Sequence, residues 1–77
     1  PNYFDLLMYR AKLYQIEGKY SLADQDYDRA LKIREDSAEA MYKKGECAYL
    51  SKEYKKAVAS LTSAVYLDQG FRVRALQ

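Results

Sequence analysis

The chain has 77 residues, about half the size of an ordinary domain, so it forms one small domain or a piece of a larger one. A single cysteine and the absence of histidine exclude an internal disulfide, a zinc site of the usual kind and any nucleophile activated by histidine. Thirteen basic and eleven acidic residues give a net charge of +2, which is too balanced to indicate a nucleic-acid or membrane surface.

The first half of the chain contains two stripes of apolar residues at helical spacing. The first stripe begins at Leu7 and predicts a helix near 4–17. Gly18 marks a turn, and a second stripe from Tyr20 predicts a helix near 20–34. We therefore expect a helical hairpin.

The second half repeats this organisation. Asp36 and Glu39 have capping-box spacing, which predicts that a helix near 38–51 starts close to Ser37. A further apolar stripe predicts a helix near 54–68.

The end of the chain contains one more turn signal, Asp68-Gln69-Gly70, after which we expect a fifth helix from about 71 onward. Proline occurs only at Pro1 and β-branched residues are few, so strand signals are sparse. The predicted fold class is all-α.

An internal repeat with a period of 34 residues organises these helices. Shifting the chain by 34 residues aligns identical residues at three pairs, Tyr20/Tyr54, Ala23/Ala57 and Ala30/Ala64. We predict a single domain fragment, 1–77, made of a first repeat near 4–37, a second near 38–71 and a partial third near 72–77.

At these positions the sequence resembles the tetratricopeptide repeat (TPR) family, whose unit is a 34-residue helix-turn-helix. The resemblance implies tandem antiparallel helix pairs in a right-handed superhelical array, of which this chain is a fragment. The family's small and aromatic positions are matched by Ala11, Gly45, Ala23, Ala57, Ala30, Ala64 and Tyr27. Its tryptophan and repeat-ending proline are absent, since Leu7, Met41, Glu35 and Gln69 occupy those places.

The first helix of each repeat carries side chains spaced three and four apart on a face outside the apolar stripe. In the TPR family this face lines a concave groove that holds a peptide. The resemblance therefore implies a partner-binding groove formed by Asp5, Met8, Tyr9, Lys12, Gln15, Ile16, Glu39, Tyr42, Lys43, Glu46, Tyr49 and Leu50.

The resemblance implies a protein–protein interaction module of an intracellular scaffold or adaptor that binds a peptide segment of its partner. Two alternatives stay open: a structural segment of a longer array in a multi-subunit complex, and a regulatory domain attached to an enzyme outside these residues. The fragment itself is not expected to be an enzyme or to bind a cofactor or metal. Self-association is a further expectation. The apolar side chains of a partial third repeat would lack the helix that normally packs on them, and a second copy of the chain could cover them instead.

Three other patterns favour ordinary structural explanations. Asp24, Asp26 and Asp28 have the spacing of a calcium-binding loop, but Arg29 replaces its essential glycine, so we expect a solvated helix surface. The lysines of the second half are interrupted by acidic residues, and we expect no nucleic-acid partner. Cys47 lies beside the apolar stripe and is expected to be a buried, unreactive thiol in a protein of the cytoplasm or nucleus.

Overall fold

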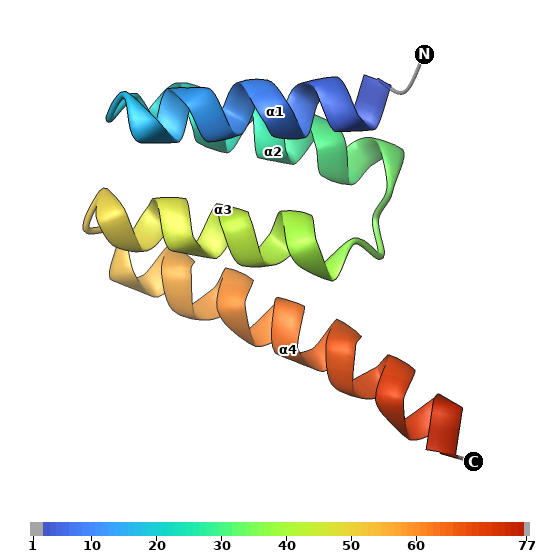
Figure 1. Ribbon diagram of the computed structural model, residues 1–77. Coiled ribbons are helices and arrows are strands. Elements are labelled where there is room, and N and C mark those ends of the chain that lie inside the picture. The colour runs from blue at the N-terminus through green and yellow to red at the C-terminus, as the bar shows by residue number, and fades with distance from the viewer. Residues whose placement is uncertain (1–2, 77) are drawn as a thin grey trace.

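A computed structural model describes the backbone of residues 3–76 and the side chains of residues 3–68. Within this part of the chain the regular structure is entirely α-helical, which confirms the predicted fold class. The helices pair as two antiparallel hairpins, one stacked on the other (Figure 1). They are α1 (Tyr3–Ile16), α2 (Tyr20–Ile33), α3 (Ala38–Leu50) and α4 (Tyr54–Leu76).

The turn inside each hairpin has the same hydrogen-bond pattern. In the first turn the amide of Lys19 donates to the carbonyl of Tyr14 over 2.8 Å, and Gly18 adopts a left-handed backbone with φ of 80°. In the second turn Glu53 donates to Ala48 over 2.8 Å, and Lys52 has φ of 68°. Both turns are Schellman motifs, which satisfy the last helical carbonyls and reverse the chain.

The N-cap residue of α3 is one position later than the capping-box spacing indicates, at Ser37 instead of Asp36. Ser37 is the N-cap, and its Oγ accepts a hydrogen bond from the amide of Ala40 over 3.1 Å. The Asp36–Glu39 capping box is therefore wrong as an assignment, although the predicted start near Ser37 is confirmed. A serine hydroxyl at this place satisfies one of the amides left free at a helix N-terminus.

The helix α4 continues without a break from Tyr54 to Leu76, so the predicted turn at Asp68–Gly70 and the separate fifth helix are wrong. A glycine in a helix interior costs only about 1 kcal/mol relative to alanine, less than the hydrogen bonds that a break would sacrifice. The prediction of a partial third repeat near 72–77 concerns side chains outside the described residues.

Small residues set the spacing of the helices. Ala11, Ala23, Ala30 and Ala40 are fully buried, and the larger core side chains pack around them. Phe4 and Leu7 form one cluster with Ala30 and Ala40, whereas Tyr27 and Cys47 form a second with Ala11 and Ala23. Side chains no larger than a methyl group allow crossing helices to approach closely.

Candidate functional site

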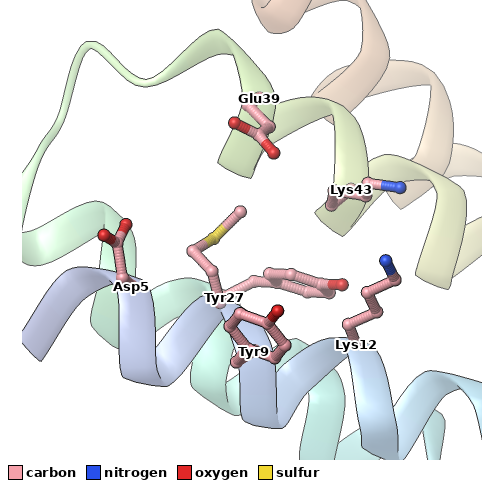
Figure 2. A pocket seen from close by; sticks show the side chains of 7 residues that line it. Asp5, Tyr9, Lys12, Tyr27, Glu39 and Lys43 are labelled. Atoms are coloured by element: carbon pink, nitrogen blue, oxygen red, sulfur yellow. The ribbon is translucent and has the colours of Figure 1, made fainter.

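A pocket of about 390 Å³ opens between the first helices of the two hairpins, α1 and α3. These two helices run in the same direction side by side, and Tyr27 of α2 reaches the pocket from behind them (Figures 1 and 2). The lining residues are Asp5, Met8, Tyr9, Lys12, Tyr27, Glu39 and Lys43. Six of these seven belong to the groove predicted from the sequence.

The charged side chains divide between the two ends of the pocket. Figure 2 shows Asp5 toward one end and Lys12 and Lys43 toward the other, with Tyr9 and Tyr27 between them. Because α1 and α3 are parallel, the acidic residues of their first turns, Asp5 and Glu39, precede the lysines on both helices. The pocket thus has an acidic end, an apolar middle and a basic end.

A chain of hydrogen bonds holds the aromatic floor in place. The hydroxyl of Tyr27 donates to Gln15 Oε1 over 2.9 Å, and Gln15 Nε2 donates to Glu46 Oε1 over 2.7 Å. Burial, reinforced by the negative potential of neighbouring groups, raises the pKa of Tyr27 to about 12, so the hydroxyl stays protonated and remains a donor. Gln15 and Glu46 therefore connect the two repeats beside the pocket.

The remaining predicted groove residues do not line this pocket. Ile16 and Leu50 are exposed at the C-terminal ends of α1 and α3. Tyr42 and Tyr49 are also exposed, and the ring of Tyr49 makes an edge-on contact with Tyr54 at 5.9 Å between centroids. These four residues lie outside the lining of the pocket.

Sequence reasoning missed Tyr27 as a pocket residue because its spacing assigns it to the core stripe. Both descriptions hold, since the side chain is 1% exposed and still forms the pocket floor. The available signal was the hydroxyl group, because a buried tyrosine usually finds a hydrogen-bond partner near a polar site.

Comparison with family models gives two adjacent matches to the tetratricopeptide repeat, at residues 5–37 and 38–71. The matched segments correspond to the α1–α2 hairpin and to α3 with most of α4. The chain belongs to the tetratricopeptide repeat family. Comparison with curated proteins gives no match.

TPR repeats generally mediate protein–protein interaction and are typically not catalytic. In this TPR chain the pocket is built by the first helix of each repeat, with the second helix of repeat one behind it. The pocket is therefore a feature of the pair of repeats, which neither hairpin forms alone.

The aspartates of α2 do not form the solvated surface expected from the sequence. Asp26 is buried, and Arg10 of α1 donates to both of its carboxylate oxygens over 2.7 and 2.8 Å. Arg29 adds a third bond of 2.8 Å. The hydrogen bonds and charge of Arg10 hold the pKa of Asp26 below its ordinary value, although burial acts in the opposite direction.

The other two aspartates bind basic residues of the second repeat. Asp28 pairs with Lys44 of α3, and Asp24 accepts a 2.7 Å hydrogen bond from Lys56 of α4. Helical geometry explains this division. Asp24 and Asp28 are four residues apart and share the face of α2 toward the second repeat, whereas Asp26, two residues from each, points to another side. Across the described residues, no group of three or more potential metal ligands gathers.

Cys47 has the environment predicted for it. The thiol is free and buried, and its Sγ donates to the carbonyl of Tyr20 over 3.2 Å. Burial raises the pKa of Cys47 to about 11, so the reactive thiolate is scarce at neutral pH.

A membrane-spanning segment would need a long helix dominated by apolar residues. Among the residues that the structure describes, no helix meets that requirement.

Proposed function

We propose that this TPR chain is a protein-interaction module that holds a peptide segment of a partner in the pocket between α1 and α3. The carrying observation is the pocket itself, which is open, partly apolar and lined by residues of both repeats. The side chains of Met8 and Tyr9 offer the kind of surface that supplies most of the energy in protein interfaces, and the buried Tyr27 supports them from below.

The pocket charges favour a bound segment with opposite charges at its two ends. Lys12 and Lys43 have no ion-pair partner among the described residues, unlike Lys44 and Lys56, which are paired. An acidic residue of the partner would therefore face the two lysines, while a basic residue would lie near the acidic end of the pocket.

The spacing of these charges follows from helix geometry. Asp5 and Lys12 are seven residues apart on α1, which corresponds to about 10 Å along the helix. About three residues of extended chain cover that distance. The preferred segment has a basic and an acidic residue about three positions apart, in either order, with an apolar residue between them.

The same features support a role as part of a scaffold or adaptor, since such proteins join partners without changing them chemically. We propose an intracellular location in the cytoplasm or nucleus. The free, buried thiol of Cys47 supports a reducing compartment.

A peptide-display library with eight randomised positions provides the test. The wild-type chain is expected to select segments in which a basic and an acidic residue about three positions apart flank an apolar residue, with one of the two orders shared by the selected peptides. In the double variant Lys12→Glu and Lys43→Glu we expect at least about tenfold weaker binding of those peptides, because attraction becomes repulsion. Replacing Met8 with Ala should weaken binding without changing the preferred charge order.

The matched control is the double variant Lys32→Glu and Lys55→Glu, which makes the same change of charge at exposed lysines of α2 and α4. It should bind the selected peptides as the wild type does, once circular dichroism shows that all variants are helical. Selection of peptides with no common charge order, or equal losses in both double variants, would refute binding in this pocket.

A further inference from the structure

The outer face of α1 differs from the equivalent face of α3. Ala40 and Cys47 of α3 are fully buried against α2. A shift of 34 residues places Leu6 and Leu13 at the same positions of α1, where they are 60% and 55% exposed. In α3 these two positions form the contact with the preceding repeat, which we call the internal junction. In α1 the same two positions are apolar and uncovered.

The outer face of α4 is the counterpart of the face of α2 that receives α3. On α2, Ala23 and Tyr27 belong to the same buried cluster as Cys47. The equivalent residues of α4 are Ala57 and Leu61. Ala57 is already buried inside its own hairpin, but Val58 and Val65 beside it are exposed, so part of this second face is also apolar and uncovered.

The side-chain sizes on the two uncovered faces are complementary. Inside the chain, the large Tyr27 and the small Cys47 share one buried cluster. At the equivalent positions, Leu61 is smaller than Tyr27 and Leu13 is larger than Cys47. A leucine–leucine contact would fill the space that tyrosine and cysteine fill at the internal junction, as volume-conserving exchanges in a core do.

An ion pair crosses the internal junction, and apolar residues take the place of both of its members on the two uncovered faces. Asp24 of α2 binds Lys56 of α4 across the junction over 2.7 Å. Their equivalents are Val58 on the outer face of α4 and Leu22 on α2, both exposed. Two apolar residues therefore stand where an ion pair connects the repeats, so docking of the two faces would leave neither side with a buried unpaired charge.

A second charged pair of this junction leaves no charge unpaired. Lys44 pairs with Asp28 inside the chain, and the equivalent residues are Arg10 and Thr62. Arg10 does not require a carboxylate at Thr62, because it donates to Asp26 of its own hairpin.

We propose that copies of this chain associate head to tail, with α1 of one copy packed on α4 of the next in the register that α3 uses on α2. The interface continues the internal junction between the repeats. Because the two docking faces differ, each added copy leaves one free face of each kind, and assembly continues without closing. This inference does not depend on peptide binding, since it uses the faces of α1 and α4 outside the pocket.

Sedimentation of the 77-residue chain across a wide concentration range provides the first measurement. The average mass is expected to rise steadily with concentration rather than stop at a dimer. Leu13→Glu blocks the face on α1, and Val58→Glu blocks the face on α4. Each variant alone should be monomeric, with association at least about tenfold weaker because a carboxylate would be buried at the junction.

Mixing the two variants is the decisive experiment. Leu13→Glu keeps an intact α4 face and Val58→Glu keeps an intact α1 face, so together they should form a one-to-one dimer that grows no further. Ala59→Glu is the matched control, because it adds the same charge to an exposed position of α4 next to Val58. It should associate as the wild type does.

Three results would overturn the proposal. A wild-type chain that stays monomeric at every concentration would leave these faces to a different occupant, such as another repeat unit. Association retained by both single variants would place the contact elsewhere on the surface. A Leu13→Glu or Val58→Glu variant that dimerises alone would indicate a symmetric interface instead of a head-to-tail one. Circular dichroism of each variant separates these results from loss of folding.

Discussion

At the scale of single residues, Gly45 of α3 lies against Leu61 of α4 with no room for a side chain. A methyl group built on this glycine would lie 2.7 Å from Cγ of Leu61 and 3.1 Å from the backbone nitrogen of the same residue. The first repeat has Ala11 at the equivalent position, fully buried against Tyr27. The absence of a side chain at Gly45 therefore allows α4 to pack close to α3.

Replacing Gly45 with Ala is expected to lower the free energy of unfolding by about 1–2 kcal/mol. Alanine favours a helix over glycine by about 1 kcal/mol, but the contact with Leu61 involves its branched carbon and backbone, which cannot move cheaply. Urea unfolding followed by circular dichroism measures the difference. The further change Leu61→Ala should cost less in the Gly45→Ala background than in the wild type. A stabilised Gly45→Ala variant would indicate that Leu61 moves aside freely.

Some residue roles could be predicted from the sequence and others could not. The burial of Ala23, Ala30 and Ala57 follows from a repeated pattern within one helix, and the structure confirms it. The burial of Asp26 depends on Arg10, sixteen residues away on another helix. No local spacing encodes such a partner, so the aspartate resembles an ordinary surface residue until the helices are placed.

At the scale of elements, the two hairpin turns share one conformation with different residues. Gly18 and Lys52 occupy equivalent positions, and both have positive φ. Glycine adopts this backbone readily, whereas the Cβ of a lysine comes too close to the following carbonyl oxygen. The second turn therefore stores strain that the first turn does not.

Replacing Lys52 with Gly should raise the free energy of unfolding by about 1 kcal/mol, because the strain of the left-handed backbone is removed. The reverse change, Gly18→Lys, should lower it by a similar amount. Thermal and urea unfolding of both variants would check the pair. If Lys52→Gly were instead destabilising, the greater freedom of glycine in the unfolded chain would outweigh the relief of strain.

The limits of the helices show what local sequence signals can determine. Apolar periodicity located the helices because it reflects the buried faces themselves. The cap of α3 was misassigned, since Asp36 and Ser37 are both good capping residues and the difference lies in backbone geometry. The turn signal at Gly70 failed because a glycine permits a break without requiring one.

At the scale of the whole molecule, α2 forms ion pairs with each of the other three helices. Asp26 binds α1, Asp28 binds α3 and Asp24 binds α4, so one helix is tied to each of the other three. Six of the predicted groove residues meet in one pocket because the repeat places α1 and α3 in parallel. The pairing of acidic α2 with basic partners then fixes how the two repeats sit against each other.

The stability of the whole chain should therefore depend on pH through Asp26. Its pKa is lowered in the folded state, so its contribution is present above the unfolded value of about 4 and is lost as the pH falls toward the folded value. Replacing Asp26 with Asn should lower the free energy of unfolding at pH 7 by about 1–3 kcal/mol. The loss stays below that of a fully buried pair because Arg10 and Arg29 are half exposed and remain hydrated.

Urea unfolding between pH 2 and pH 7 should show the difference between Asp26→Asn and wild type shrinking in acid. The control is Asp36→Asn, a change at an exposed linker residue, which should show little difference at any pH. A difference for Asp26→Asn that stays constant down to pH 2 would mean that the carboxylate contributes through packing instead of charge.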